Sequence, residues 1–381
     1  MPTVALCMIV KNEMEFLADC LRPLAPRCDQ VVIVDTGSTD GTIGLAERYA
    51  TTLLKRPFTD DFSAARNAAL DRAHTDWALF LDADERLTGP EFERLRALLP
   101  TLSAEVGGVR LLRYSFLRTG GFFAGHELKV VRARPGIRYR RRVLETLAPA
   151  LAEAGLRDVH APVILDHFGH CRPPAVRDAK LCRYLRLIDT QLAEGGPDPV
   201  LDAYASLMLR SLGRFGEALA RSDRSVTSGA DLAQVWLIRG DVLRCLGRDY
   251  DALAAYDAGL GLAPGSPDLW NMRGVVALET GDAGAAVAAF DRALSLAPRL
   301  PHVHVNLGLA EQSRGAWDRA AGHFRLAGRM DPAFYTDRWT GRVDNDPFRP
   351  LYNHTIYGYA GLGYHLAYCT MRASGELPEA S

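Results

Sequence analysis

The sequence predicts an α/β domain with a mostly parallel, Rossmann-like sheet, followed by an all-α domain. Up to about residue 172, short apolar runs alternate with helical segments, and this alternation is typical of βαβ units and a parallel sheet. From about residue 173 the chain becomes rich in Ala, Leu and Arg and carries a repeat of constant length. A chain of 381 residues is long enough for two or three domains.

The elements of the first half follow one another in order. Short apolar runs bounded by polar residues suit buried strands, and they occur at residues 4–10, 31–35 and 77–81. Helical spacing of apolar residues occurs at residues 15–25, 42–50 and 66–74. Polar clusters follow the three strands, at residues 11–13, 35–38 and 82–84. Because ligands bind at the carboxyl ends of parallel strands, we expect a site there.

The second half contains an internal repeat of 34 residues. The same step (274 − 240 and 308 − 274) links four series of residues, which are Gly240, Gly274 and Gly308; Gly247, Gly281 and Gly315; Tyr256, Phe290 and Phe324; and Pro264, Pro298 and Pro332. This period predicts tetratricopeptide repeats, each a pair of helices joined by a turn. We expect a helical domain over residues 173–332, with three clear repeats and a degenerate one that contains Gly213. An aromatic-rich segment, 333–381, is expected to cap the last repeat, although it could instead contact an acceptor.

The composition excludes several classes of protein. The charge is nearly balanced, with 45 basic and 46 acidic residues, so nucleic acid or an anionic membrane is not expected as the main partner. No apolar run has the length of a membrane span, and no signal peptide is visible. Seven cysteines without a CxxC pair suit reduced thiols. We therefore expect a cytoplasmic protein, and the sequence leaves open whether it forms a homodimer.

Asp82 and Asp84 are the strongest candidates for chemistry. Residues two apart in an extended segment project to the same side, so both carboxylates can face one ligand. Such a pair can hold Mg²⁺ or Mn²⁺ and leaves coordination positions open for diphosphate oxygens and water. The structural alternative is a solvated acidic loop that caps the next helix.

Four segments together carry a family resemblance: LCMIVKNE, VVIVDTGSTDGT, FSAARNAAL and WALFLDADE. In this order they resemble the GT-A catalytic domain of inverting family 2 glycosyltransferases, over roughly residues 3–170. In particular, the chain is similar to bacterial members fused to tetratricopeptide repeats, which include peptide S-glycosyltransferases. The resemblance implies a nucleotide-sugar donor, usually a UDP-sugar, and a divalent ion, Mn²⁺ or Mg²⁺.

The resemblance also implies roles for individual residues. Asp84 would bind the metal directly, with Asp82 beside it nearer the ribose, and His167 in ILDHFGH would complete the metal shell. Residues on the nucleotide side would be Val10, Asn12, Glu13, Asp35, Arg66, Asn67, Asp82 and Ala83. Each has a structural alternative: Glu13 could sit in the first turn of a helix, and Arg66 could form an ordinary salt bridge. His167 could likewise be structural, with Asp166 and His170 as its neighbours.

The catalytic base has two candidates. An inverting transfer needs a carboxylate that takes the proton of the acceptor. The segment 125–145 resembles the family pattern that carries this acid, and Glu127 and Glu145 stand at the two matching positions. Leu144 replaces the usual histidine. We favour Glu145, with Glu127 second; a surface glutamate on a strand edge is the structural alternative for each.

These observations favour a metal-dependent inverting glycosyltransferase. Its acceptor is expected to be a peptide or protein, because the repeats offer a concave groove that suits peptides. A small natural product or a lipid carrier is also open as acceptor. A non-catalytic repeat scaffold with a relic catalytic domain is the alternative function. A glycoside hydrolase fits poorly, because its two carboxylates must face each other across the bond.

Overall fold

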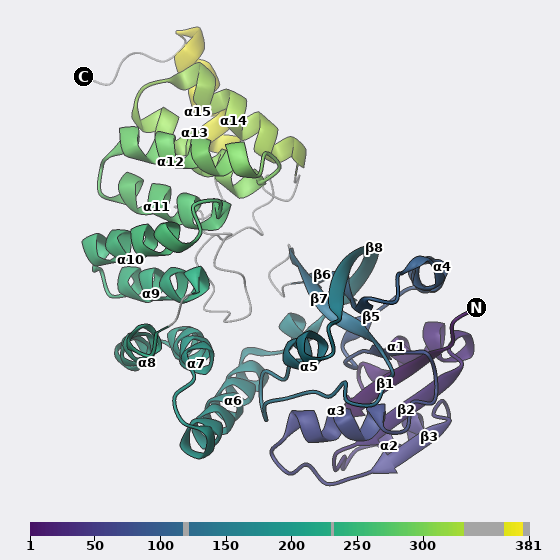
Figure 1. Ribbon diagram of the computed structural model, residues 1–381. Coiled ribbons are helices and arrows are strands. Elements are labelled where there is room, and N and C mark those ends of the chain that lie inside the picture. Colours follow the sequence, from purple (N-terminus) through teal and green to yellow (C-terminus); the bar gives the residue numbers. More distant parts are fainter. Residues whose placement is uncertain (117–121, 230–231, 331–361, 376–381) are drawn as a thin grey trace. The chain divides into compact units, whose positions relative to one another are not determined.

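The computed structural model describes residues 1–116, 122–229, 232–330 and 362–375. Internal contacts divide them into two compact units, the first ending at residue 194 and the second comprising the described residues from 195 onward. The first unit is an α/β domain and the second is helical (Figure 1). The predicted fold class is therefore confirmed.

The first unit is built on one mixed sheet. Its strand order over the described residues is β3-β2-β1-β4-β7-β6-β8-β5. The strands are β1 Val4–Val10, β2 Gln30–Asp35, β3 Thr52–Lys55, β4 Trp77–Phe80, β5 Glu85–Arg86, β6 Val106–Phe116, β7 Phe122–Arg132 and β8 Arg157–His167. The pairs β1–β2, β1–β4 and β2–β3 are parallel, as predicted, whereas β7 joins β4 in antiparallel orientation. The carboxyl ends of β1, β2 and β4 thus meet at one edge.

Helices cover both faces of the sheet because its central strands alternate their side chains between two cores. On β1, Leu6 and Met8 belong to one core, which includes Leu17 of α1. Ala5 and Cys7 belong to the other core, together with α3. The helices of this unit are α1 Leu17–Leu24, α2 Thr42–Ala46, α3 Phe62–Leu70, α4 Gly89–Leu98, α5 Ala148–Glu153 and α6 Pro174–Gly195, with 3₁₀ turns η1 Ala25–Arg27, η2 Leu99–Thr101 and η3 Gly169–Cys171.

Two boundaries differ from those expected. Helix α3 begins at Phe62 rather than at residue 66, because the Asp61 side chain accepts a hydrogen bond from the Ala64 N–H and caps the helix. Helix α6 groups with the first unit, although the sequence boundary at residue 172 assigned it to the second domain. Side chains of α6 line a pocket of the first unit, which gives the physical reason for this grouping.

The second unit consists of helix pairs. They are α7 Pro199–Ser211 with α8 Phe215–Thr227, α9 Ala233–Cys245 with α10 Asp249–Leu262, α11 Pro267–Glu279 with α12 Ala283–Leu296, and α13 Pro301–Ser313 with α14 Trp317–Met330. They follow one another as a stack in Figure 1. The last three pairs coincide with the clear repeats and the first pair with the degenerate one.

The periodic residues explain how each pair packs. A Cβ on Gly274 would lie 2.6 Å from the Phe290 ring, and one on Gly308 would lie 2.6 Å from the Phe324 ring. The glycine of each first helix therefore makes room for the aromatic side chain of the second. The turn glycines, such as Gly281 with φ 88°, adopt the left-handed conformation that ends a helix.

The expected capping segment is described only over residues 362–375. Helix α15, Leu362–Ser374, places Cys369 and Leu366 in one apolar cluster with Phe324 of α14, as a cap would. The other aromatic residues on which that expectation rested, Phe334, Tyr335, Trp339, Phe348, Tyr352, Tyr357 and Tyr359, lie outside the described residues. Among the described helices, none combines the length and apolarity needed to cross a bilayer.

Candidate active site

A pocket of about 410 Å³ opens in the first unit at the carboxyl ends of β1 and β4. Its walls come from segments that are far apart in the sequence. The residues that line it include Val10, Lys11, Glu13, Thr36, Phe58, Phe62, Arg66, Asp82, Ala83, Asp84, Glu145, His167, Arg172, Lys180, Arg183 and Tyr184. Most of the predicted site residues therefore share one cavity.

The two carboxylates after β4 have different partners. Asp82 Oδ1 accepts a hydrogen bond from Arg66 Nη2 at 3.0 Å. Asp84 Oδ1 lies 3.7 Å from His167 Nε2, and its Oδ2 accepts from Arg172 Nη2 at 3.3 Å. Asp82 thus pairs with α3, and Asp84 with the last residue of β8 and the segment that follows it.

Arg66 links Asp82 to a second carboxylate. Its Nε donates to Glu145 Oε1 at 2.7 Å, and the side chain is almost buried, with the guanidinium beside the Phe80 and Tyr139 rings. Burial lowers the pKa of Arg66, but Asp82 and Glu145 outweigh it and raise the pKa well above its usual value. Burial alone would raise the pKa of Asp82, yet Arg66 and Lys129 hold it far below its ordinary range. Both groups are therefore charged at neutral pH.

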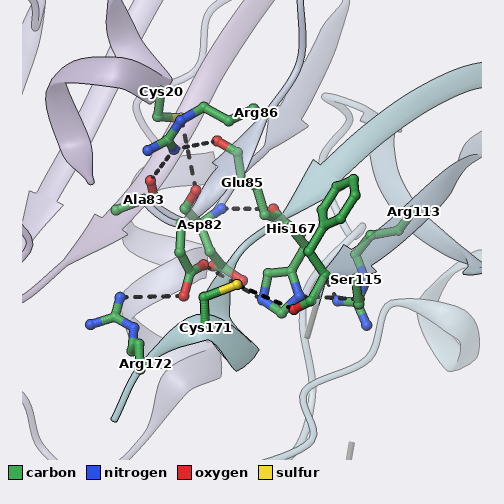
Figure 2. Close-up of polar contacts among 12 residues, drawn as sticks. Cys20, Asp82, Ala83, Glu85, Arg86, Arg113, Ser115, His167, Cys171 and Arg172 are labelled. Atoms are coloured by element: carbon green, nitrogen blue, oxygen red, sulfur yellow. Dashed lines mark hydrogen bonds and ion pairs between the residues drawn. The ribbon is translucent and has the colours of Figure 1, made fainter. Parts of the chain in front are cut away.

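His167 is held in place as a neutral ring. Its Nδ1 lies 3.1 Å from the Ser115 hydroxyl (Figure 2), which fixes the ring. Its Nε2 lies 3.7 Å from Asp84 Oδ1. Burial lowers the pKa of His167 to about 3, so the ring is unprotonated at neutral pH and can offer a lone pair to a metal.

Gly169 leaves the space that this pair needs. A Cβ at position 169 would lie 2.6 Å from His167 Nε2 and 2.8 Å from Asp84 Oδ2. Among the described residues no group of three or more His, Cys, Asp or Glu side chains is placed to hold a metal ion, and Asp82 accepts a hydrogen bond from Arg66. Asp84 and His167 are of the residue types that could bind a divalent ion, whose remaining positions would then be open to diphosphate oxygens and water.

The two candidate bases differ in position. Glu145 lines the pocket, whereas Glu127 is outside the lining residues. Glu127 pairs with Arg113 at 2.6 Å and Lys129 at 3.1 Å. Although burial raises the pKa of Glu127, these two cations lower it below its usual value. The geometry therefore favours Glu145.

The predicted nucleotide residues fall into two groups. Glu13 lines the pocket and accepts from Arg172 Nη2 at 2.7 Å, with its pKa raised by burial. Asn12 and Asn67 do not line it. Asn12 accepts from the Thr39 N–H and so joins two loops, and Asn67 exchanges two hydrogen bonds with the backbone of Tyr139. The side-chain amides of Asn12 and Asn67 thus fix the positions of segments around the pocket.

Asp35 ends β2 and is buried. Its Oδ1 accepts from the N–H groups of Gly37 and Ser38, at 3.0 Å each. Its Oδ2 is buried and has no hydrogen-bond partner in the part of the chain that the structure describes. A buried acceptor without a partner suits a ligand that supplies an N–H donor.

Sequence reasoning missed several features of the site, among them Arg172, Glu85 and helix α6. Glu85 is fully buried, accepts from the Asp82 N–H at 2.9 Å and pairs with Lys129; burial raises the pKa of Glu85 to about 7. Helix α6 contributes Lys180 and Tyr184, and no family motif covers it. The signal that could have found it is the spacing of the lining residues Val176, Ala179, Lys180, Arg183 and Tyr184, which occupy one helical face.

Comparison with known proteins identifies relatives of parts of this chain. Residues 5–144 match the model of the family described as Glycosyl transferase family 2. The match includes β4 and the two aspartates after it.

Two curated relatives resemble parts of the chain. The "TPR repeat-containing protein Synpcc7942_0270" of Synechococcus elongatus is 33% identical over 211 residues, covering 53% of this chain and 51% of that protein. The "Lipopolysaccharide core biosynthesis glycosyltransferase LpsC" of Rhizobium meliloti is 34% identical over 143 residues, covering 35% and 49%. The chain thus spans about half the length of these relatives.

Among solved structures, a "thermophilic TPR protein" of Thermus thermophilus is similar, with a TM-score of 0.36. The two sequences are 22% identical, and the match covers 41% of this chain and 88% of the Thermus protein. The assignment of the helical unit rests instead on its helix pairs and its 34-residue period.

Proposed function

We propose that the protein is a metal-dependent inverting glycosyltransferase that uses a nucleotide-sugar donor, with UDP as the expected nucleotide. The observation that carries the proposal is the position of Asp82 and Asp84. They follow the buried strand β4, which runs parallel to β1, and line a pocket that also holds Arg66 and His167, and the family match covers this strand.

Asp84 and His167 would hold the divalent ion, Mn²⁺ or Mg²⁺, with Asp82 beside them. A bound ion would neutralise the charge that develops on the departing diphosphate. Gly169 supports this assignment, because its missing side chain keeps the space between the two ligands open.

The nucleotide would bind across the ends of β1 and β2. Asp35 offers a buried oxygen without a partner among the described residues, which suits an N–H donor on the base. Arg66 carries a fixed positive charge on the pocket wall, where phosphate oxygens can accept charge-assisted hydrogen bonds.

Glu145 is the proposed base. As the acceptor atom bonds to the anomeric carbon and the bond from that carbon to the diphosphate oxygen breaks, the acceptor proton passes to Glu145. The hydrogen bond from Arg66 holds one oxygen of this carboxylate in the pocket. Inversion follows because the acceptor attacks from the side opposite the leaving group.

A peptide or protein side chain is the acceptor class that we favour, because stacked helix pairs form extended surfaces that suit chains. The name of the Rhizobium meliloti relative raises a saccharide acceptor as a second class.

The test is a panel of UDP- and GDP-sugars incubated with the full-length protein and Mn²⁺ or Mg²⁺, with release of the nucleotide as the readout. We expect one donor to be hydrolysed slowly and the Asp84→Ala variant to lose this release. If no donor is turned over or bound, the scaffold function would replace this proposal. If one donor is active, peptide extracts and lipopolysaccharide extracts are added to it in separate mixtures. Mass spectrometry of the products then shows which of the two acceptor classes is glycosylated.

A further inference from the structure

Arg172 occupies an unusual place in the pocket. Its Nη2 donates to Glu13 Oε2 at 2.7 Å and to Asp84 Oδ2 at 3.3 Å, and Figure 2 shows it approaching the acidic segment. The guanidinium also lies over the Phe16 ring, 4.6 Å from its centre. Arg172 therefore bridges Glu13, in the segment after β1, and Asp84, a proposed metal ligand.

The charges explain why an arginine is needed at this point. Without a counter-ion, Glu13, Asp82 and Asp84 would place three carboxylates on the wall of one pocket. Burial of unpaired carboxylates is costly. Arg172 donates to the two carboxylates that Arg66 does not reach and offsets one of their two negative charges.

A divalent ion at Asp84 would change this balance. The ion brings two positive charges to the same carboxylate, and Arg172 is then close to a like charge. A diphosphate bound to the ion supplies new anionic oxygens in the same pocket, and a planar guanidinium matches phosphate well.

Helix α6 supplies a second cation beside Arg172. Lys180 lines the pocket from the helical face that also carries Tyr184. Its Nζ lies 5.6 Å from the centre of the Tyr184 ring. Tyr184, and then Asp84 and Asp82, raise the pKa of Lys180 despite its burial, so the ammonium stays charged. Both cations lie beyond residue 144, outside the segment that matches the family model.

We propose that Arg172 is a diphosphate-binding residue that pairs with Asp84 when the metal is absent and with the diphosphate of the donor when the metal is bound. This inference rests on the proposed function. It predicts opposite effects of one substitution on two ligands. Loss of the guanidinium frees Asp84 for the ion, but it removes a charge-assisted contact to the nucleotide.

The experiment compares the wild-type chain with Arg172→Gln. Binding of Mn²⁺ without nucleotide is measured by electron paramagnetic resonance, and binding of UDP at saturating Mn²⁺ by calorimetry, with GDP as a second probe. We expect Arg172→Gln to bind Mn²⁺ about threefold or more tightly and UDP about tenfold more weakly, the size of one charge-assisted hydrogen bond.

Two further variants are measured, one as a control and one as a conservative substitution. Arg177→Gln is the matched control, because Arg177 lies on α6, pairs with Asp178 and does not line the pocket; it should leave both affinities unchanged. Arg172→Lys keeps the charge but loses the planar fork, and we expect intermediate values for both ligands. Thermal melting of each variant checks that it is folded, and Arg172→Lys provides the comparison if Arg172→Gln unfolds.

The outcomes separate the two proposals. If the wild-type chain binds neither UDP nor GDP, the proposed function is overturned and the role of Arg172 falls with it. If the wild type binds UDP with Mn²⁺ and Arg172→Gln (or Arg172→Lys, should the first unfold) shows unchanged affinities, or weaker Mn²⁺ binding, only the role of Arg172 is overturned.

Discussion

Arg66 and Glu145 form an ion pair of 2.7 Å between residues that are 79 positions apart. The same guanidinium donates to Asp82 at 3.0 Å. Arg66 is thus the link between the nucleotide side of the pocket and the proposed base.

Removal of this arginine should harm both stability and activity. Arg66→Gln leaves two carboxylates without their buried partner, and we expect a loss of about 3 kcal/mol in the free energy of unfolding. Arg66→Lys keeps the charge but cannot reach both acids with the same geometry, so it should restore much of the stability and little of the activity. Urea denaturation and donor turnover measure the two effects. Equal activity of Arg66→Lys and the wild type would show that a planar guanidinium, which donates to both Asp82 and Glu145, is not needed for activity.

Substitution of Gly169 should act on the metal and not on the fold. Gly169→Ala places a Cβ within 3 Å of both His167 Nε2 and Asp84 Oδ2. We expect weaker Mn²⁺ binding and at least a tenfold loss of turnover, with a stability change within about 1 kcal/mol. Gly44→Ala is the matched control, since a Cβ there would meet nothing within 4 Å. Unchanged Mn²⁺ affinity in Gly169→Ala would argue against the Asp84–His167 pair as the ligands.

Two helical glycines of the second unit, Gly274 of a repeat series and Gly261 outside those series, predict opposite effects on stability. Gly274→Ala forces a Cβ against the Phe290 ring and should destabilise the helical unit by about 1–3 kcal/mol. Gly261→Ala points into open space on α10 and should stabilise it by about 0.5–1 kcal/mol. Thermal or urea unfolding of the full chain, followed by circular dichroism, measures both. A neutral Gly274→Ala would show that the contact can relax.

A histidine pair predicts acid sensitivity of the helical unit. Nδ1 of His304 lies 3.2 Å from Nδ1 of His323, so a second proton between the rings is disfavoured. Burial lowers the pKa of both rings below the ordinary histidine value. The unfolded chain therefore binds protons first as the pH falls below about 6.5, and stability is lost from there toward the lower folded pKa values. His323→Gln should reduce the difference in urea midpoint between pH 7 and pH 5. An unchanged difference would assign the acid sensitivity to other groups.

Local patterns in the sequence were enough to predict much of the fold. The apolar runs gave β1, β2 and β4, and the 34-residue period gave the helix pairs, because Gly274 and Phe290 must match within one repeat. Strands β6 and β7 were not predicted from the sequence. Their place in the sheet depends on strands that are distant in the sequence, and a local pattern does not show these.

The site was predictable only in part, for the same reason. Asp82, Asp84 and Arg66 stand in recognisable motifs next to strand ends or on a helix. Arg172 and Glu13 are 159 positions apart, and no local pattern joins them. Asn12 and Asn67 are predicted from motif positions to lie on the nucleotide side, and this stays a prediction; their hydrogen bonds go to backbone groups of Thr39 and Tyr139, which no local pattern indicates.

The central claim is that Asp84 and His167 bind a divalent ion in a pocket that also takes a nucleotide diphosphate. Crystals of the full chain soaked with Mn²⁺ and UDP test it most directly through the anomalous signal of manganese. We predict a peak between Asp84 and His167, in contact with the diphosphate. Diphosphate in the pocket without manganese beside these two residues, or manganese bound only elsewhere, would contradict the account.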